Sequence, residues 1–341
     1  MKAWLALLAA LSLPLSAQNY DPNALFAIKQ LKIGQISDHT GLTGVTVLRF
    51  DQGATASVDV RGAAPGTRET DLLKPENLVD KVHAIVLSGG SAFGLDAMSG
   101  VARQLESEGI GFNTGVARVP IVTGAVLFDL VVGDPKARPD ATMGQAAAKS
   151  AKRSGLTEGN VGAGTGASVG KIRGMDHATK SGLGVYSVQL DSGLVVGAVV
   201  AVNAWGDVVD RSGQLLAGTR DENGFIPGTA LIFQGANEPG FVGKNTTIGA
   251  IVTNATLTKA EALKVAQMAH DGYARAIRPV HTMNDGDAIF AAGTGELGPV
   301  NINTLGVIAA EVMETAIHRA VQAAESAGGL PAASDVAKMN K

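Results

Sequence analysis

Apolar residues recur along the first third of the chain in short runs, each bounded by glycine or polar residues. Residues 41–50 are mostly apolar after a glycine-rich turn, and residues 54–60 alternate apolar and polar positions, as a half-exposed strand does. A buried strand at residues 84–87 leads through a Ser-Gly-Gly turn into a helix that should end at a glycine, near residues 106–109. The pattern therefore predicts strands and helices mixed along the chain.

The middle of the chain continues the same mixture. Three apolar runs predict further strands: "VPIVTGAVLFDL", "SGLGVYSVQL" and "LVVGAVVAVNAWGDVVD", the last of which is long enough to cross a buried sheet. The series Thr258-Lys259-Ala260-Glu261 is a capping box that begins a helix reaching about Ile277. The inward-facing positions predicted for this helix are Leu263, Ala266, Ala269 and Tyr273.

A final helix is predicted at residues 305–326, with Val307, Ile308, Val312 and Ile317 as its apolar positions. Strands and helices follow no strict βαβ order, which favours a layered α+β fold over a doubly wound one. No repeat or low-complexity linker interrupts residues 18–341, so we expect them to form a single domain.

Composition narrows the functional classes. The chain of 341 residues has a net charge of -3 and no long basic run, so binding to nucleic acid or to an anionic membrane surface has no electrostatic support. Its 44 glycines, with 45% hydrophobic and 17% charged residues, indicate a compact protein rich in tight turns. The absence of cysteine excludes disulfides, thiolate nucleophiles and cysteine metal sites.

The N-terminus has the layout of a secretory signal peptide. Lys2 precedes an apolar run at residues 3–15, and the small-residue end Leu15-Ser16-Ala17 suits a signal peptidase. The apolar run is short for a transmembrane span, and a buried first helix is the alternative. We expect cleavage after Ala17 and a mature chain that begins at Gln18 and is exported, either to the periplasm or out of the cell.

Several glycine-rich and histidine motifs do not fit a known site. Ile172 follows Gly170-Lys171 where a phosphate-binding loop needs serine or threonine, and only the looser dinucleotide pattern fits Gly162, Gly164 and Ala167. Phe93 stands where the nucleophile elbow around Ser91 would need glycine. The histidines show no paired metal-ligand spacing: His39, His83, His177, His270, His281 and His318.

The stretch "GKNTTIGAIVT" offers a different nucleophile. A threonine hydroxyl needs an adjacent base, and a threonine at a chain terminus carries one in its own α-amine. Cleavage of the Asn245–Thr246 bond would expose that amine, through attack of the Thr246 hydroxyl on the Asn245 carbonyl. From the residues alone, a polar turn that leads into a strand is the more common structure for such a pair.

Long segments of the sequence resemble the DmpA-type L-aminopeptidase/D-esterase family, which includes β-peptidyl aminopeptidases and the NylC-like hydrolases of 6-aminohexanoate oligomers. The resembling segments span nearly the whole mature chain in order: "VDVRGAAPGTRETDLL", "VLSGGSAFGLDAMSGVARQLE", "VPIVTGAVLFDL", "GNVGAGTGASVGK", "NTTIGAIVTNATLTKAEALKVAQMAHDGYARAIRPVHT" and "NDGDAIFAAGTG". A match of this extent is far more specific than any single motif.

The resemblance implies a four-layer αββα sandwich that processes itself into two chains, residues 18–245 and 246–341. These two chains would remain an obligate pair and assemble into a homo-oligomer, a tetramer. The resemblance also assigns site residues: Thr246 as the nucleophile of the threonine branch, with Lys171, Asn203, Asp285 and Asp287 around it. Some family members have a tyrosine near the oxyanion, and its nearest counterpart here is Phe128, which cannot donate a hydrogen bond.

The implied positions also suit the chemistry. Asn203 ends a buried apolar strand, where its amide and the Lys171 ammonium could support a developing oxyanion. Asp285 and Asp287 would share one face of an extended segment, and close carboxylates form a coupled pair that can shuttle a proton. The alternatives are ordinary buried polar groups for Lys171 and Asn203, and an Asx-rich turn or an acidic calcium-like loop for the two aspartates.

The sequence therefore predicts an exported, self-processing amidohydrolase that acts on small peptide or amide substrates and uses no metal or organic cofactor. Two alternatives remain open at this point. The first is acyl transfer of the ornithine-acetyltransferase type, against which the signal peptide argues. The second is an exported binding protein that keeps the fold without catalysis. The sequence does not determine whether α-, β- or ω-amino substrates are preferred, because they differ by methylenes that a pocket discriminates only modestly.

Overall fold

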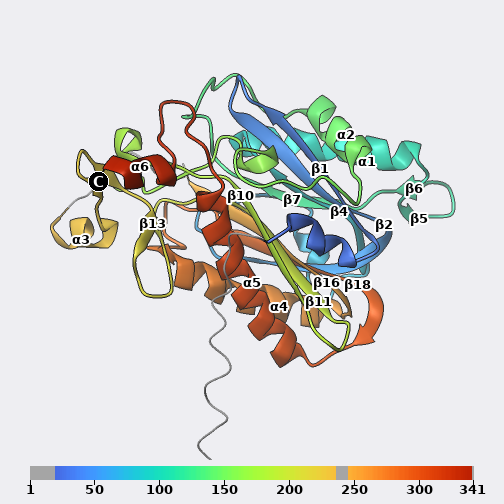
Figure 1. The fold of residues 1–341 in the computed structure, drawn as a ribbon. Coiled ribbons are helices and arrows are strands. Elements are labelled where there is room, and N and C mark those ends of the chain that lie inside the picture. Colours follow the sequence, from blue (N-terminus) through green and yellow to red (C-terminus); the bar gives the residue numbers. More distant parts are fainter. Residues whose placement is uncertain (1–19, 236–244, 340–341) are drawn as a thin grey trace, which may run out of the picture.

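The computed structural model describes residues 20–235 and 245–339 (Figure 1). The signal peptide predicted at residues 1–17 and the residues just before Asn245 lie outside these ranges. Within them, nine strands hydrogen-bond in the order β10-β11-β16-β18-β2-β4-β7-β3, with β1 paired to β2. These strands are β1 (Leu31–Asp38), β2 (Thr43–Val60), β3 (Gly66–Arg68), β4 (Lys81–Ser88), β7 (Val122–Val126), β10 (Leu183–Gln189), β11 (Val195–Asn203), β16 (Thr246–Thr256) and β18 (Ala288–Pro299).

One long strand joins the two halves of this sheet. The N-terminal half of β2 pairs with β4, and its C-terminal half pairs with β18. The sequence predicted two strands here, at residues 41–50 and 54–60, but they form one strand of 18 residues with a register shift between Arg49 and Ala54. The polar residues in between do not end the strand, because the irregularity accommodates them within the ladder.

Helices cover both outer faces of the folded sheet (Figure 1). Helices α4 (Lys259–Ala276) and α5 (Ile302–Gln322) pack on one half, where Tyr273 and Met313 share a hydrophobic cluster with Ile251 of β16. Helices α1 (Ala97–Ser107) and α2 (Ala141–Ser150) pack on the other half, where Val101 shares a cluster with Val86 of β4.

A third cluster lies between the two halves of the sheet. It joins Leu48 and Leu87 of one half to Val199, Ile248 and Phe290 of the other. The order of the layers is therefore helix, sheet, sheet, helix, which confirms the predicted four-layer αββα architecture. Alternation of apolar residues toward both faces of each strand supplies these three hydrophobic interiors.

The predicted helix positions are mostly right. The capping box at Thr258 and Glu261 is present, and Ala266, Ala269 and Tyr273 of α4 are buried. Leu263, predicted to face inward, is only partly buried. The final helix begins three residues earlier than expected, because Asn301 caps its N-terminus, and it ends four residues earlier, at Gln322. Of the apolar positions on that helix, Val312 and Ile317 are buried, whereas Val307 is 57% exposed.

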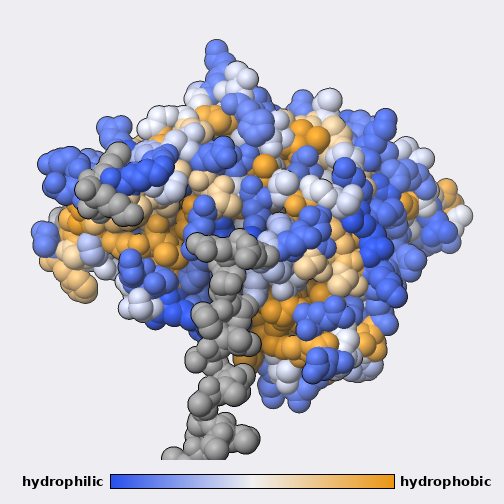
Figure 2. Space-filling model, viewed as in Figure 1, coloured by the Kyte–Doolittle hydropathy of each residue, from blue (hydrophilic) through white to orange (hydrophobic). Residues whose placement is uncertain are grey.

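Shorter elements connect these layers. On the face shown in Figure 2, hydrophilic side chains predominate, and apolar ones gather over α3 (Gly228–Phe233), whose Phe233 is 93% exposed.

No helix in residues 20–235 or 245–339 combines the length and the apolar character that crossing a bilayer requires. The other strands and the last α-helix of the described residues are β5 (Phe112–Asn113), β6 (Arg118–Val119), β8 (Ser168–Val169), β9 (Thr179–Lys180), β12 (Asp207–Val209), β13 (Leu215–Ala217), β14 (Arg220–Asp221), β15 (Gly224–Phe225), β17 (Ile277–Arg278) and α6 (Ala333–Met339).

Candidate active site

Thr246 is the first residue of β16, a strand held between β11 and β18 near the middle of the fold. It is 3% exposed, and the backbone N–H of Gly286 donates a hydrogen bond of 3.1 Å to its Oγ1. The register of the antiparallel β11–β16 pair places Thr246 directly opposite Asn203. Two of the residues predicted from the sequence are thus brought together by the pairing of strands that are far apart in the chain.

Asn203 is fully buried and connects three segments. Its Oδ1 accepts hydrogen bonds from Lys171 Nζ at 2.7 Å and from the Ser168 N–H at 3.1 Å. Its Nδ2 donates to the carbonyl oxygen of Phe128 at 2.7 Å. The Asn203 amide retains a second N–H, so it can still donate to an oxyanion as the sequence suggested.

Lys171 lies on the loop that follows the glycine-rich segment, and it is 0% exposed. Burial lowers the pKa of its ammonium to about 7, while the negative charges of Asp285 and Asp129 oppose this shift. Its Nζ donates to both Oδ1 and the backbone carbonyl of Asn203, at 2.7 and 3.3 Å. A buried cation is therefore placed next to the strand position opposite Thr246.

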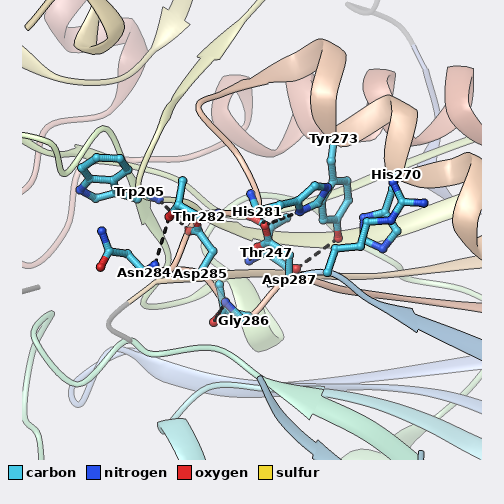
Figure 3. Close-up of polar contacts among 12 residues, drawn as sticks. Trp205, Thr247, His270, Tyr273, His281, Thr282, Asn284, Asp285, Gly286 and Asp287 are labelled. Carbon is cyan, nitrogen blue, oxygen red and sulfur yellow. Dashed lines mark hydrogen bonds and ion pairs between the residues drawn. The ribbon is translucent and has the colours of Figure 1, made fainter. Parts of the chain in front are cut away.

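Asp285 and Asp287 precede β18, are each 1% exposed and lie on either side of Gly286 (Figure 3). The Gly286 N–H donates the hydrogen bond to Thr246 Oγ1. Asp285 accepts hydrogen bonds from the Trp205 N–H and from both the N–H and the hydroxyl of Thr282. Asp287 Oδ1 accepts the Thr247 N–H at 2.7 Å. The carboxylates thus hold the immediate surroundings of Thr246, and the loop between them contacts its hydroxyl.

The surroundings of Asp285 favour its protonated form. Burial raises the pKa of Asp285 to about 6, and the neighbouring charge of Asp287 acts in the same direction. Close carboxylates cannot both be ionised without cost, so one of them retains a proton more readily than the other. The calcium-loop alternative receives no support, because residues 20–235 and 245–339 contain no group of three or more potential metal ligands.

Asn245, on the other side of the candidate scissile bond, is also buried. Its Nδ2 donates to the carbonyl oxygen of Asn284 at 3.1 Å, whereas its Oδ1 has no hydrogen-bond partner among the described residues. The loop that carries Asp285 and Asp287 therefore contacts the residues on both sides of the Asn245–Thr246 bond. The strand expected after the polar pair begins at Thr246, and both residues of the pair are buried; the residues before Asn245, where a turn would lie, are outside the described ranges.

The structure adds residues that the motifs did not indicate. The backbone groups of Phe128, Trp205 and Gly286 contact the site, and no side-chain pattern could have identified them. Phe128 thus lies beside Asn203, as the resemblance suggested for a tyrosine, but it contributes its carbonyl oxygen. Thr282 and His281 also contact the acidic residues, and their proximity in the sequence to Asp285 was the available signal.

Comparison with known proteins identifies the family. The sequence profile of peptidase family S58 matches residues 23–333. The chain belongs to peptidase family S58. It is therefore a hydrolase of peptide or amide bonds, and the acyl transferase and the binding protein that the sequence left open are not supported.

Relatives of this S58 peptidase carry related names. An uncharacterized aminopeptidase of Mycobacterium leprae is 42% identical over 313 residues, which cover 84% of each chain. A 6-aminohexanoate-oligomer endohydrolase of a Kocuria species is 33% identical, over 87% of this chain and 85% of its own. The solved L-aminopeptidase D-Ala-esterase/amidase of Ochrobactrum anthropi, described as a variant of the Ntn hydrolase fold, aligns with a TM-score of 0.64 at 17% identity. That alignment covers 89% of this chain and 86% of the solved one, and it supports the predicted fold class.

Substitution of Gly286 should displace Thr246. A Cβ at this position would lie 2.8 Å from Thr246 Oγ1 and 2.4 Å from the Ala64 carbonyl oxygen, so the loop would have to shift. We expect Gly286→Ala to lower the free energy of unfolding by ~1–3 kcal/mol, as overpacking usually does. We expect its kcat to fall by ~10²-fold, because small misplacements of reacting groups are costly.

Gly293→Ala is the matched control for that measurement. Gly293 lies within β18, the strand that Gly286 precedes, and its Cβ would crowd the Ala255 carbonyl oxygen at 2.7 Å, far from Thr246 along the strand. It should lose stability while the folded protein retains its kcat. Equal kcat losses in both variants would show that crowding acts through general destabilisation and not through Thr246.

The buried Lys171 should make stability depend on pH. Its pKa is about 7 in the folded protein, against 10.5 for an ordinary lysine, so between these limits unfolding takes up a proton. Stability therefore rises with pH across this window relative to a variant without the ammonium. Melting temperatures of wild type and Lys171→Met should show the wild type gaining on the variant between about pH 7 and pH 10. A constant difference would mean that Lys171 does not change its charge there.

Proposed function

We propose that this S58 peptidase processes itself at the Asn245–Thr246 bond and then uses Thr246 as an N-terminal nucleophile. The observation that carries this proposal is the position of Thr246. It starts a central strand opposite Asn203, with its hydroxyl held by Gly286 and a buried cation and two buried carboxylates close by. A solvated turn would need none of these groups.

Self-processing follows from the same groups. Thr246 Oγ attacks the carbonyl carbon of Asn245, the bond from that carbon to the Thr246 nitrogen breaks, and the hydroxyl proton passes to the nitrogen. Water then hydrolyses the resulting ester, which leaves a carboxylate on Asn245 and a free hydroxyl and α-amine on Thr246. The hydrogen bond from Asn245 Nδ2 to the Asn284 carbonyl oxygen supports the proposal, because it anchors the leaving segment to the same loop.

The processed enzyme then acts on substrates in two steps. Thr246 Oγ attacks an amide carbonyl while the α-amine accepts the hydroxyl proton, and that proton leaves with the departing amine. Asn203 and Lys171 stabilise the negative charge on the carbonyl oxygen as it develops. Water hydrolyses the threonyl ester and regenerates the nucleophile. Asp287 holds the start of the strand through the Thr247 N–H, and the Asp285–Asp287 pair accommodates the proton during these transfers.

The names of the relatives suggest the substrate class. We infer that the enzyme removes N-terminal residues from peptides or amino-acid amides, or cleaves ω-amino oligoamides. Hydrolysis of aminoacyl p-nitroanilides and of 6-aminohexanoate oligomers, compared at equal enzyme concentration, distinguishes these activities. The proposal further includes export after cleavage at Ala17 and assembly of the paired chains into a homo-tetramer. A native mass measurement tests the assembly.

The deciding experiment is an intact-mass spectrum of the purified protein. We expect two polypeptides that meet between Asn245 and Thr246, the longer one beginning at Gln18 when the protein is purified from an exporting host. A single chain that nevertheless hydrolyses aminoacyl amides would contradict self-processing. Two chains that meet elsewhere would contradict the assignment of the nucleophile.

A further inference from the structure

A histidine outside the predicted site binds one of its carboxylates. The backbone N–H of His281 donates to Asp287 Oδ2 at 3.1 Å, and the ring Nδ1 lies 2.9 Å from the same oxygen (Figure 3). The other carboxylate oxygen, Oδ1, accepts the N–H of Thr247. Asp287 therefore bridges His281 to the residue that directly follows the nucleophile.

The orientation of the His281 ring is fixed by aromatic neighbours on α4. The ring stacks on Tyr273, with centroids 5.9 Å apart and an interplanar angle of 26°, and it meets the edge of His270 at 4.7 Å. Tyr273 also donates its hydroxyl to the Thr247 carbonyl oxygen at 3.3 Å. The N–H and C=O of Thr247 are thus held by Asp287 and Tyr273, and the His281 ring contacts both of these partners.

The hydrogen-bond pattern determines which ring nitrogen donates. Asp287 Oδ2 already accepts the His281 backbone N–H, so the tautomer with a proton on Nδ1 gives this acceptor oxygen a second donor. His281 Nε2 is buried and has no hydrogen-bond partner in residues 20–235 or 245–339. In this part of the chain the imidazole therefore makes its polar contact with Asp287 alone. That arrangement suits an orienting group and not a proton relay.

We propose that His281 is a positioning residue: its Nδ1–H orients Asp287, and Asp287 holds the Thr246–Thr247 backbone so that Thr246 Oγ1 faces the scissile carbonyl. The inference rests on the proposed function, because it assigns His281 a part in the reaction of Thr246. Without the donor, Asp287 Oδ2 keeps the His281 backbone N–H but loses the contact that sets the rotation of the carboxylate. Misplacement of a nucleophile by ~1 Å typically costs ~10²-fold in rate.

Three substitutions separate the donor from the ring. Asparagine places an amide nitrogen where Nδ1 lies and suits the left-handed backbone at this position, where φ is 57°. Phenylalanine keeps the stacked ring without a donor, and glutamine moves the donor to the position of Nε2. We expect His281→Asn to keep kcat within ~5-fold of wild type, and His281→Phe and His281→Gln to lose ~10²-fold with little change in KM, as misplacement without lost binding predicts.

Self-cleavage provides a second readout, because it uses the same nucleophile. Intact-mass time courses should show the asparagine variant processed and the other two slowed. Melting temperatures identify any variant that fails to fold. If the phenylalanine variant fails to fold, the comparison of the glutamine variant with the asparagine variant still tests the inference. Equal losses in all three variants, or wild-type kcat in the phenylalanine variant, would overturn the inference. Activity in a Thr246→Ala protein would instead overturn the proposed function.

Discussion

The Thr246→Ala protein is expected to remain one uncleaved chain and to lose roughly 10⁴-fold or more of its amidase activity, as enzymes without their nucleophile do. The reason is that the hydroxyl serves both reactions and that the α-amine appears only after the first of them. The methyl group left by this change fits a site that is already buried, so the fold should be retained. Intact mass, melting temperature and hydrolysis of an aminoacyl p-nitroanilide measure these three outcomes.

Thr247 provides the matched control, because it is adjacent, similarly buried and also a threonine. Its Oγ1 has no hydrogen-bond partner among the described residues, whereas its backbone N–H and C=O are both held. Thr247→Val keeps the shape of the side chain and should leave self-cleavage and kcat near wild type. Loss of activity in the valine variant, with activity retained in Thr246→Ala, would exchange the roles of the two threonines.

Asn203→Asp should reduce kcat by ~10²–10³-fold, the usual loss when an oxyanion donor is removed. The new carboxylate can still accept hydrogen bonds from Lys171 and Ser168, so the contacts of Oδ1 are preserved. It cannot donate, so the hydrogen bond to the Phe128 carbonyl oxygen and any bond to an oxyanion are lost. KM should change less than kcat, because the missing interaction strengthens only in the transition state.

Ser168→Ala is the control for this measurement. Its hydroxyl lies 3.5 Å from the same Asn203 Oδ1, but its backbone N–H makes the shorter contact and is unaffected by the change. We expect kcat to stay close to that of wild type. A normal kcat in the Asn203→Asp enzyme would contradict the prediction. It would show that Asn203 takes no part in the reaction and that Lys171 and backbone donors stabilise the oxyanion.

The fold could largely be predicted from local patterns. Apolar runs of strand length, the capping box at Thr258 and the glycine stop after α1 depend on contacts within a few residues, and each is present. The order of the four layers came from the resemblance, because the pairing of distant strands has no local signal. The continuity of β2 was mispredicted for the same reason, because the irregular ladder with β4 and β18 decides it.

The sequence by itself determined which chemical groups are available. The chain has no cysteine thiolate to offer, its histidines are scattered, and an Asn-Thr pair stands at the start of an apolar strand. Only the tertiary structure decided that Thr246 lies opposite Asn203, that Gly286 contacts its hydroxyl, and that His281 holds Asp287. These contacts join residues on different strands and loops, and backbone groups that look alike at every position supply several of them. Strand register and burial therefore turn a common polar pair into a candidate catalytic centre.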